Sequence, residues 1–231
     1  MIYQIHYHPD QKQYCFNQPP YRTIPTRPES EPLPLLDDIR VIPLLREGWV
    51  RQQLCEYSVM IYHWRRRSSE TDWVGFTSWR QLFKGYAYVM NLENKQSLPK
   101  NKIITWGRRE LNSTLGAQAE ENHPGIIEAT TVLLRDVHQQ AIPKEFFSTT
   151  TGAFCSYWAA PTKLFVEYME WSYPLIFEAI VRWGNDPPFN RHDGSPQLTG
   201  RNRSLAFLQE RLFNIWAIKT NQVFDDKTCR I

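Results

Sequence analysis

Alternating apolar and polar positions open the chain and predict a β-strand over residues 2–8. In this stretch, "IYQIHYH", Tyr and Ile side chains alternate with Gln and His side chains, and Pro9 and Asp10 end the pattern. A repeat of two residues is typical of a strand. The six prolines of residues 17–34 then predict an extended loop, because proline does not fit a helix interior.

Apolar residues at steps of three and four predict amphipathic helices over residues 49–67, 122–140 and 202–219. A further helix is expected to open at Pro161 and to bend at Pro174. The expected buried stripes are Leu54, Tyr57, Ile61 and Trp64 in the first helix, Ile127, Thr131, Leu134 and Val137 in the second, and Leu205, Leu208, Leu212 and Ile215 in the last.

Short apolar runs at residues 73–78, 102–106 and 152–158 predict three more strands. Because strands alternate with helices, the sequence predicts an α/β fold with a mostly parallel central sheet flanked by helices. No repeat or linker divides the chain, so we expect residues 1–231 to form a single domain. The glycines and prolines of residues 184–200 predict a flexible flap.

In such folds, ligands bind beyond the carboxyl ends of the parallel strands. The segments that follow the predicted strands are residues 6–10, 77–81, 106–109 and 158–162. Residues 72–83, "DWVGFTSWRQLF", pass directly from an apolar strand to hydroxyl, indole and guanidinium groups. This composition favours a binding site at the strand end over a plain turn.

Composition narrows the class of ligand. The net charge of +3, from 27 basic and 24 acidic residues, is too small to favour a nucleic-acid partner, but it suits an anionic small ligand. Nine tryptophans offer faces on which sugar rings or bases stack, or they fill the core; both interpretations stay open. The four cysteines show no CxxC spacing, which argues against zinc and favours reduced thiols.

No signal peptide and no run of 18 apolar residues is visible, so we expect a cytoplasmic protein. Dinucleotide-binding, P-loop and nucleophile-elbow sequences are also absent. His6 and His8 share a strand face and predict either a hydrogen-bonding pair or a weak metal site. Without an Asp-x-Asp sequence, binding of Mn²⁺ or Mg²⁺ is possible but has no dedicated carboxylate pair.

Three separated stretches together resemble a known family. "LCEYSVMIYHW" (residues 54–64) followed by residues 72–83 is similar to a helix and strand of bacterial capsular-polysaccharide and lipopolysaccharide glycosyltransferases of the GT-A type. The matching residues are Cys55, Glu56, Tyr62, Trp64, Gly75, Arg80 and Phe83. The stretches "LFVEYMEWSYPLIFE" and "RNRSLAFLQERLFNIW" look like the Phe-x-x-Tyr-x-x-Trp helix and the closing Glu-Arg-Leu-x-x-x-Trp helix of that family.

The chain departs from the family pattern at two places. Ser78-Trp79-Arg80-Gln81 stands where the family has His-Tyr-Arg-Arg, and Tyr7-His8-Pro9 stands where it has Thr-His-Lys. The resemblance implies a single GT-A-like, Rossmann-like domain. It also implies transfer of a sugar from a nucleotide sugar, with a UDP-sugar favoured, to a polysaccharide or glycolipid acceptor. The alternative is a catalytically silent relative that binds a glycan or a nucleotide sugar. A glycolipid acceptor would also bring peripheral contact with a membrane.

The resemblance and the strand ends together suggest roles for individual residues. Arg80 is expected to bind the donor diphosphate, unless it forms a structural salt bridge. Glu210 is expected to act as a base or to bind acceptor, unless it pairs structurally with Arg211. The expected donor-binding residues are His6, His8, Asp10, Ser78, Trp79 and Arg80, the catalytic residues Glu210 and Asp193, and the acceptor-binding residues Trp158 and Arg203.

Overall fold

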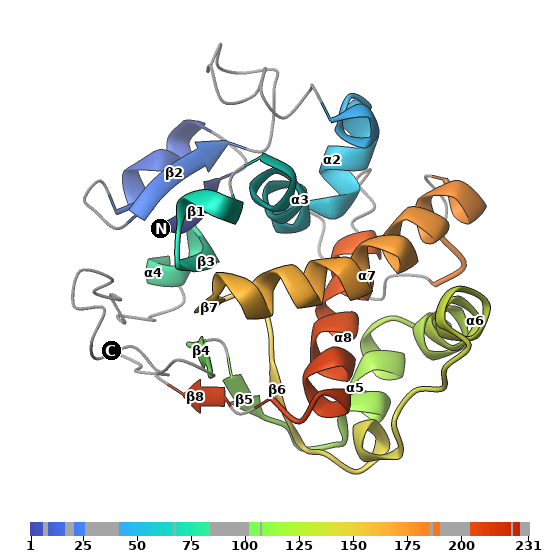
Figure 1. The fold of residues 1–231 in the computed structure, drawn as a ribbon. Helices are drawn as coiled ribbons and strands as arrows, with labels where there is room; N and C mark the ends of the chain where they lie inside the picture. The colour runs from blue at the N-terminus through green and yellow to red at the C-terminus, as the bar shows by residue number, and fades with distance from the viewer. Residues whose placement is uncertain are drawn as a thin grey trace.

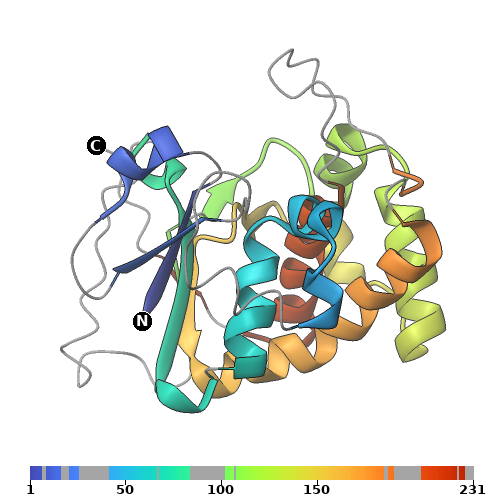
Figure 2. The ribbon, with the colours of Figure 1, turned by 90° about the horizontal axis from the view of Figure 1, so that it is seen from above.

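The computed structural model has an α/β arrangement in which strands from both ends of the chain share one sheet (Figure 1). Its longer helices lie together on one side of that sheet, as the second view shows (Figure 2). The structure describes residues 1–6, 9–16, 21–25, 42–66, 68–83, 102–106, 108–184, 187–189, 204–222 and 224–226.

The main sheet has six strands in the order β2-β1-β3-β7-β4-β8. All neighbouring strands pair in parallel except β7, which runs antiparallel to both β3 and β4. The strands are β1 Ile2–His6, β2 Tyr21–Pro25, β3 Trp73–Ser78, β4 Ile103–Thr105, β7 Trp158–Pro161 and β8 Phe224–Asp226. The predicted mostly parallel sheet is therefore confirmed. A separate antiparallel pair joins β5 (Arg108–Glu110) and β6 (Thr151–Ala153).

Helices connect these strands. The α-helices are α2 Gly48–Leu54, α3 Glu56–Arg66, α4 Arg80–Phe83, α5 Leu115–Asn122, α6 Ile126–His138, α7 Thr162–Trp183 and α8 Ser204–Lys219. Short 3-10 helices are η1 Pro9–Tyr14, η2 Pro43–Leu45, η3 Ser68–Glu70 and η5 Lys144–Phe147. Figure 2 shows α3 and α7 beside the same side of the sheet, with α8 behind α3. No helix in the described part of the chain is long and apolar enough to cross a membrane.

The apolar stripes predicted for the helices at residues 49–67 and 202–219 face the core. The members Leu54, Tyr57 and Ile61 are fully buried, as are the four stripe residues of α8. Helix α7 continues through Pro174. The free thiols of Cys15 and Cys55 are buried, and that of Cys155 is partly exposed.

Several predicted boundaries are wrong, mostly because the chain turns within an apolar stretch. The helix expected over residues 49–67 is two helices, broken at Cys55, whose φ of 48° lies in the left-handed region. The loop expected over residues 17–34 contains β2, which pairs with β1. The helix expected over residues 122–140 begins only at Ile126, after α5 and a turn.

The strand expected over residues 152–158 is also wrong, and this error bears on function. Strand β6 ends at Ala153, and β7 begins at Trp158. Between them, Cys155 and Ser156 have φ values of 64° and 52°. Two consecutive residues with side chains in the left-handed region make a strained turn, and such strain persists only where surrounding contacts enforce it.

Candidate functional site

One edge of the main sheet gathers most of the described residues that were predicted to bind ligand. Strands β1, β3 and β4 run in the same direction, so their carboxyl ends meet at this edge. Because β7 runs the opposite way, its amino end arrives there too, with Trp158 opposite Phe76. The left-handed turn at residues 155–156 therefore lies beside the end of β3.

Tyr157 connects the strand ends. Its hydroxyl shares a 2.9 Å hydrogen bond with Oγ of Ser78, and its backbone carbonyl accepts hydrogen bonds from the Trp106 N–H and the Thr105 hydroxyl, both at 3.1 Å. Burial raises the pKa of the Tyr157 phenol well above its ordinary value, and Cys155 and Glu56 raise it further. The Ser78 hydrogen bond and Arg80 oppose the rise. The phenol therefore stays neutral and can both donate and accept.

Arg80 begins α4 directly after β3, and its side chain is exposed. Its backbone N–H donates to Oγ of Ser78 at 3.3 Å, which fixes the start of the turn. The guanidinium pairs with no acidic side chain in the described part of the structure. A guanidinium at a strand end can bind phosphate oxygens through two parallel hydrogen bonds.

Two aromatic side chains contact each other where η1 meets the start of α4. The Trp79 ring is partly buried, and its centroid is 6.0 Å from that of Tyr14, the last residue of η1. Tyr14 is 43% exposed. Tyr14 is not among the residues predicted from the sequence, because it belongs to no regular apolar pattern. Its position eight residues after the end of β1, in the segment that follows a strand end, is the one signal that could have drawn attention to it.

The other residues expected near the end of β1 divide between core and surface. His6 is buried, so its imidazole packs inside the protein. Asp10 is exposed in η1, and its backbone carbonyl accepts a 2.8 Å hydrogen bond from the Gln13 amide. The predicted sites His8, Asp193 and Arg203 lie outside the described residues. No group of three His, Cys, Asp or Glu side chains suited to a metal forms among the residues that are described.

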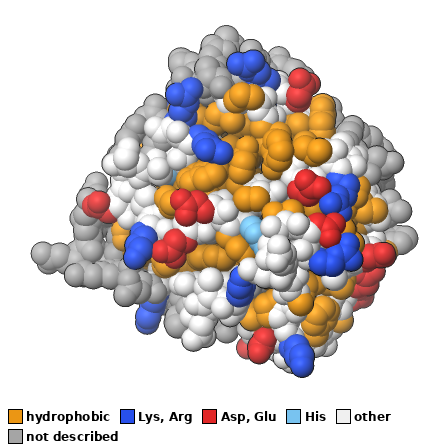
Figure 3. Space-filling view, turned by 45° about the vertical axis from the view of Figure 1, so that its right-hand side comes forward, with side chains coloured by type: hydrophobic (Ala, Val, Ile, Leu, Met, Phe, Trp, Pro, Cys, Tyr) orange, Lys and Arg blue, Asp and Glu red, His pale blue; other side chains and the backbone are white. Residues whose placement is uncertain are grey.

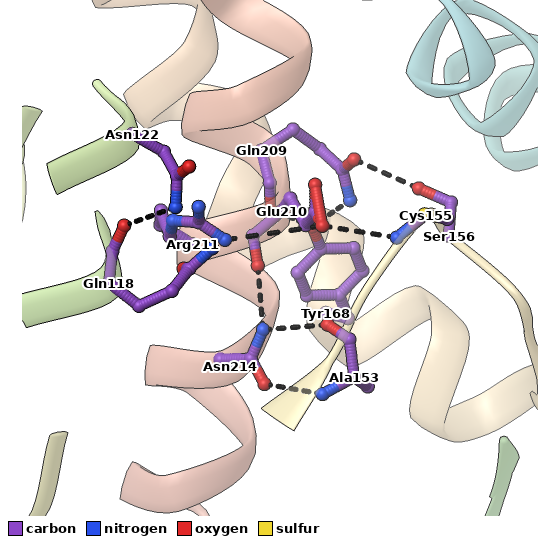
Figure 4. Close-up of polar contacts among 10 residues, drawn as sticks. All are labelled: Gln118, Asn122, Ala153, Cys155, Ser156, Tyr168, Gln209, Glu210, Arg211 and Asn214. Atoms are coloured by element: carbon purple, nitrogen blue, oxygen red, sulfur yellow. Dashed lines mark hydrogen bonds and ion pairs between the residues drawn. The ribbon is translucent and has the colours of Figure 1, made fainter. Parts of the chain in front are cut away.

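Three polar side chains of α8 hold the segment between β6 and β7 (Figure 4). The Ser156 hydroxyl donates to Oε1 of Gln209 at 3.1 Å. The Cys155 N–H donates to Oε1 of Glu210, also at 3.1 Å. Asn214 binds both backbone groups of Ala153, accepting from its N–H at 2.9 Å and donating to its carbonyl at 2.8 Å. These contacts enforce the left-handed turn.

Glu210 is mostly enclosed, with 16% of its side chain exposed. Its Oε1 lies 4.0 Å from Nη1 of Arg211, a side chain that is only 3% exposed and packs over the Phe154 ring. Burial lowers the pKa of the Arg211 guanidinium, and Glu210 and Cys155 oppose this effect. Within the described structure, the hydrogen bond from Cys155 goes to Oε1 of Glu210, and Oε2 accepts none. Glu210 thus anchors the turn through one carboxylate oxygen, and its side chain is in part open to solvent.

Trp158 does not lie where an acceptor sugar could stack on it. Its side chain is 1% exposed, and its ring stacks on Phe213 with centroids 4.8 Å apart. The rings of Phe76 and Tyr168 contact it edge-on. Trp158 therefore belongs to the core. The preceding residue, Tyr157, is equally buried and would act on a ligand only indirectly, by holding Ser78 at the end of β3.

Comparison with known proteins places the chain in a family. Residues 51–222 match the family described as a domain of unknown function (DUF4422). No curated protein and no solved structure gives a significant match. Since the match covers well over half of the 231 residues, this chain belongs to the DUF4422 family.

Proposed function

We propose that the protein is a glycosyltransferase of GT-A type, which moves a sugar from a nucleotide sugar, with a UDP-sugar favoured, to a polysaccharide or glycolipid acceptor. One observation carries the proposal: a chain of hydrogen bonds connects the residue that bears an exposed cation with a partly exposed carboxylate. The backbone N–H of Arg80 donates to Oγ of Ser78, and the Ser78 and Tyr157 hydroxyls share a hydrogen bond. Two residues before Tyr157, the Cys155 N–H donates to Oε1 of Glu210. The stretches that resemble glycosyltransferases span nearly the same residues as the family match.

Each group has a task in sugar transfer. The bond between the anomeric carbon and the diphosphate breaks, and Arg80 stabilises the charge that develops on the departing diphosphate. If the enzyme inverts, Oε2 of Glu210 accepts the proton of the acceptor hydroxyl, whose oxygen forms the new glycosidic bond. Tyr14 and Trp79 offer ring faces for the nucleotide base.

The test is a screen of UDP-, GDP- and dTDP-sugars by thermal shift, with Mn²⁺ and with a chelator. A donor that binds only the folded state raises the melting temperature by mass action. At a donor concentration of 100 times Kd, the free energy of unfolding rises by about 2.7 kcal/mol. If no nucleotide sugar raises the melting temperature, the proposal is wrong. Binding without sugar transfer to any acceptor would instead identify a silent, nucleotide-sugar-binding relative.

A matched pair of variants tests Arg80. Arg80→Ala should weaken donor binding about 10- to 100-fold, which corresponds to a lost charge-assisted bond of roughly 1.5–3 kcal/mol. Arg66→Ala removes the same charge from an exposed position at the far end of α3 and should leave binding unchanged. Equal donor affinity in both variants would show that Arg80 does not bind the diphosphate.

A further inference from the structure

An apolar surface lies where the end of α3 meets the outer side of α7. Phe177 and Val181, one turn apart on α7, are 44% and 63% exposed and are two of the four large hydrophobic side chains that are exposed in the described part of the chain. The ring of Phe177 stacks against Tyr173, with centroids 6.2 Å apart. Tyr173 in turn contacts Trp64, at 5.2 Å. We call this set (Trp64, Tyr173, Phe177 and Val181) the α7 surface.

Figure 3 views the side of the molecule on which α7 lies, and it shows hydrophobic side chains gathered there among charged ones. The Arg65 guanidinium lies over the rings of Trp64 and Tyr173, 4.1 and 5.0 Å from their centroids. Arg66 follows it and is exposed. Neither arginine forms an ion pair within the described structure, whereas Arg182, further along α7, is paired with Glu178 and Asp136.

We propose that the α7 surface binds an anionic lipid bilayer. Aromatic side chains beside arginines suit the boundary between lipid headgroups and acyl chains, where the rings bury and the guanidinium groups stay with phosphates. The two unpaired arginines supply attraction to negative headgroups. A stable protein partner is less suitable, because a standard interface uses about 20–30 residues a side, far more than this surface offers.

Acidic residues near the α7 surface give the proposal further consequences that can be tested. Glu170 is exposed on α7 one turn before Tyr173, so its carboxylate would face the same headgroups and oppose binding. The α7 surface also lies at the opposite end of α3 from Glu56, which is near the Tyr157 phenol. Changes at the surface should therefore leave the sheet-edge site intact, and this inference does not depend on the proposed transferase activity.

The experiment is co-sedimentation of the full chain with vesicles of phosphatidylcholine alone or mixed with phosphatidylglycerol. The native protein should sediment with the mixed vesicles only, and high salt should release it. Arg65→Gln with Arg66→Gln should weaken binding about 25-fold, which is fivefold for each arginine at roughly 1 kcal/mol. Phe177→Ser with Val181→Ser should abolish sedimentation, and Glu170→Gln should strengthen binding to the mixed vesicles.

Phe147→Ser is the matched control, because Phe147 is 47% exposed but lies in η5, away from α7. This variant should bind as the native protein does. The proposal is overturned if native protein ignores the mixed vesicles, or if the α7 variants bind as well as the control. It is also overturned if gel filtration shows a dimer that Phe177→Ser disrupts, since the surface would then bind a second copy. If the variant with Phe177→Ser and Val181→Ser fails to fold, the variant with Arg65→Gln and Arg66→Gln still tests the proposal.

Discussion

Glu210 is the residue at which a structural and a chemical role can be separated most sharply. Two substitutions remove different parts of its interactions. Glu210→Gln keeps an oxygen that can accept the Cys155 N–H, which is 3.1 Å from Oε1, but removes the charge facing Arg211. Glu210→Ala removes both. The difference between the two variants therefore measures the hydrogen bond to the turn, and the effect of the glutamine measures the charge.

The contacts of Glu210 set the loss of stability expected for each variant. Glu210→Gln leaves the Arg211 guanidinium, which is only 3% exposed, without the carboxylate 4.0 Å away. Removal of one partner from a buried pair costs about 3 kcal/mol, so Glu210→Gln should lower the free energy of unfolding by about this amount. The hydrogen bond that glutamine keeps and alanine loses is a neutral one, so Glu210→Ala should cost about 1 kcal/mol more than Glu210→Gln.

Urea denaturation of the three proteins measures these values, and the same samples serve in the nucleotide-sugar assay. If Glu210 is also the base, both variants should lose sugar transfer while they still bind the donor. A glutamine variant as unstable as the alanine variant would refute the proposed anchoring of the turn. A glutamine variant that transfers sugar at the native rate would show that Glu210 acts only on structure.

Three further predictions concern the sheet and its edge. Gly75→Ala should lower the free energy of unfolding by about 1–3 kcal/mol in urea, because the new Cβ would lie 2.8 Å from Cβ of Ala159; Gly48→Ala, with no atom closer than 3.7 Å, is the control and should be neutral. Tyr157→Phe removes the hydrogen bond to Ser78, so it should lower the free energy of unfolding by about 1 kcal/mol and weaken donor binding. Unchanged affinity for the donor would contradict the proposal that Ser78 lies at the donor site. Burial raises the pKa of Cys15 from 9.0 to about 11, so protonation of its thiol favours the folded state; this stability is complete below pH 9 and is lost as the pH rises to about 11. Cys15→Ala should lose less stability than the native protein between pH 9 and about 11, as measured by urea denaturation at each pH. If the free energy of unfolding depends on pH in the same way in both proteins, the thiol is not responsible.

The spacing of apolar residues was sufficient to predict the helices and strands whose apolar residues all pack into the core. The apolar steps of α8 and the apolar run of β3 follow from the burial of one face or of a whole strand. The position of Ser78, Trp79 and Arg80 at the carboxyl edge also followed from the sequence, because a mostly parallel sheet brings its strand ends together. The α/β class and the order of the main elements could thus be deduced before any contact was known.

Tertiary contacts decided what the pattern could not. Residues 152–158 are uniformly apolar or small, and the turn within them is held by Glu210, 55 residues away in the chain. That contact leaves no local trace in the sequence, yet it buries Trp158 and brings Tyr157 to the site. A sequence specifies which side chains avoid water through their spacing, but a left-handed turn of two residues with side chains is stable only when distant groups satisfy its backbone.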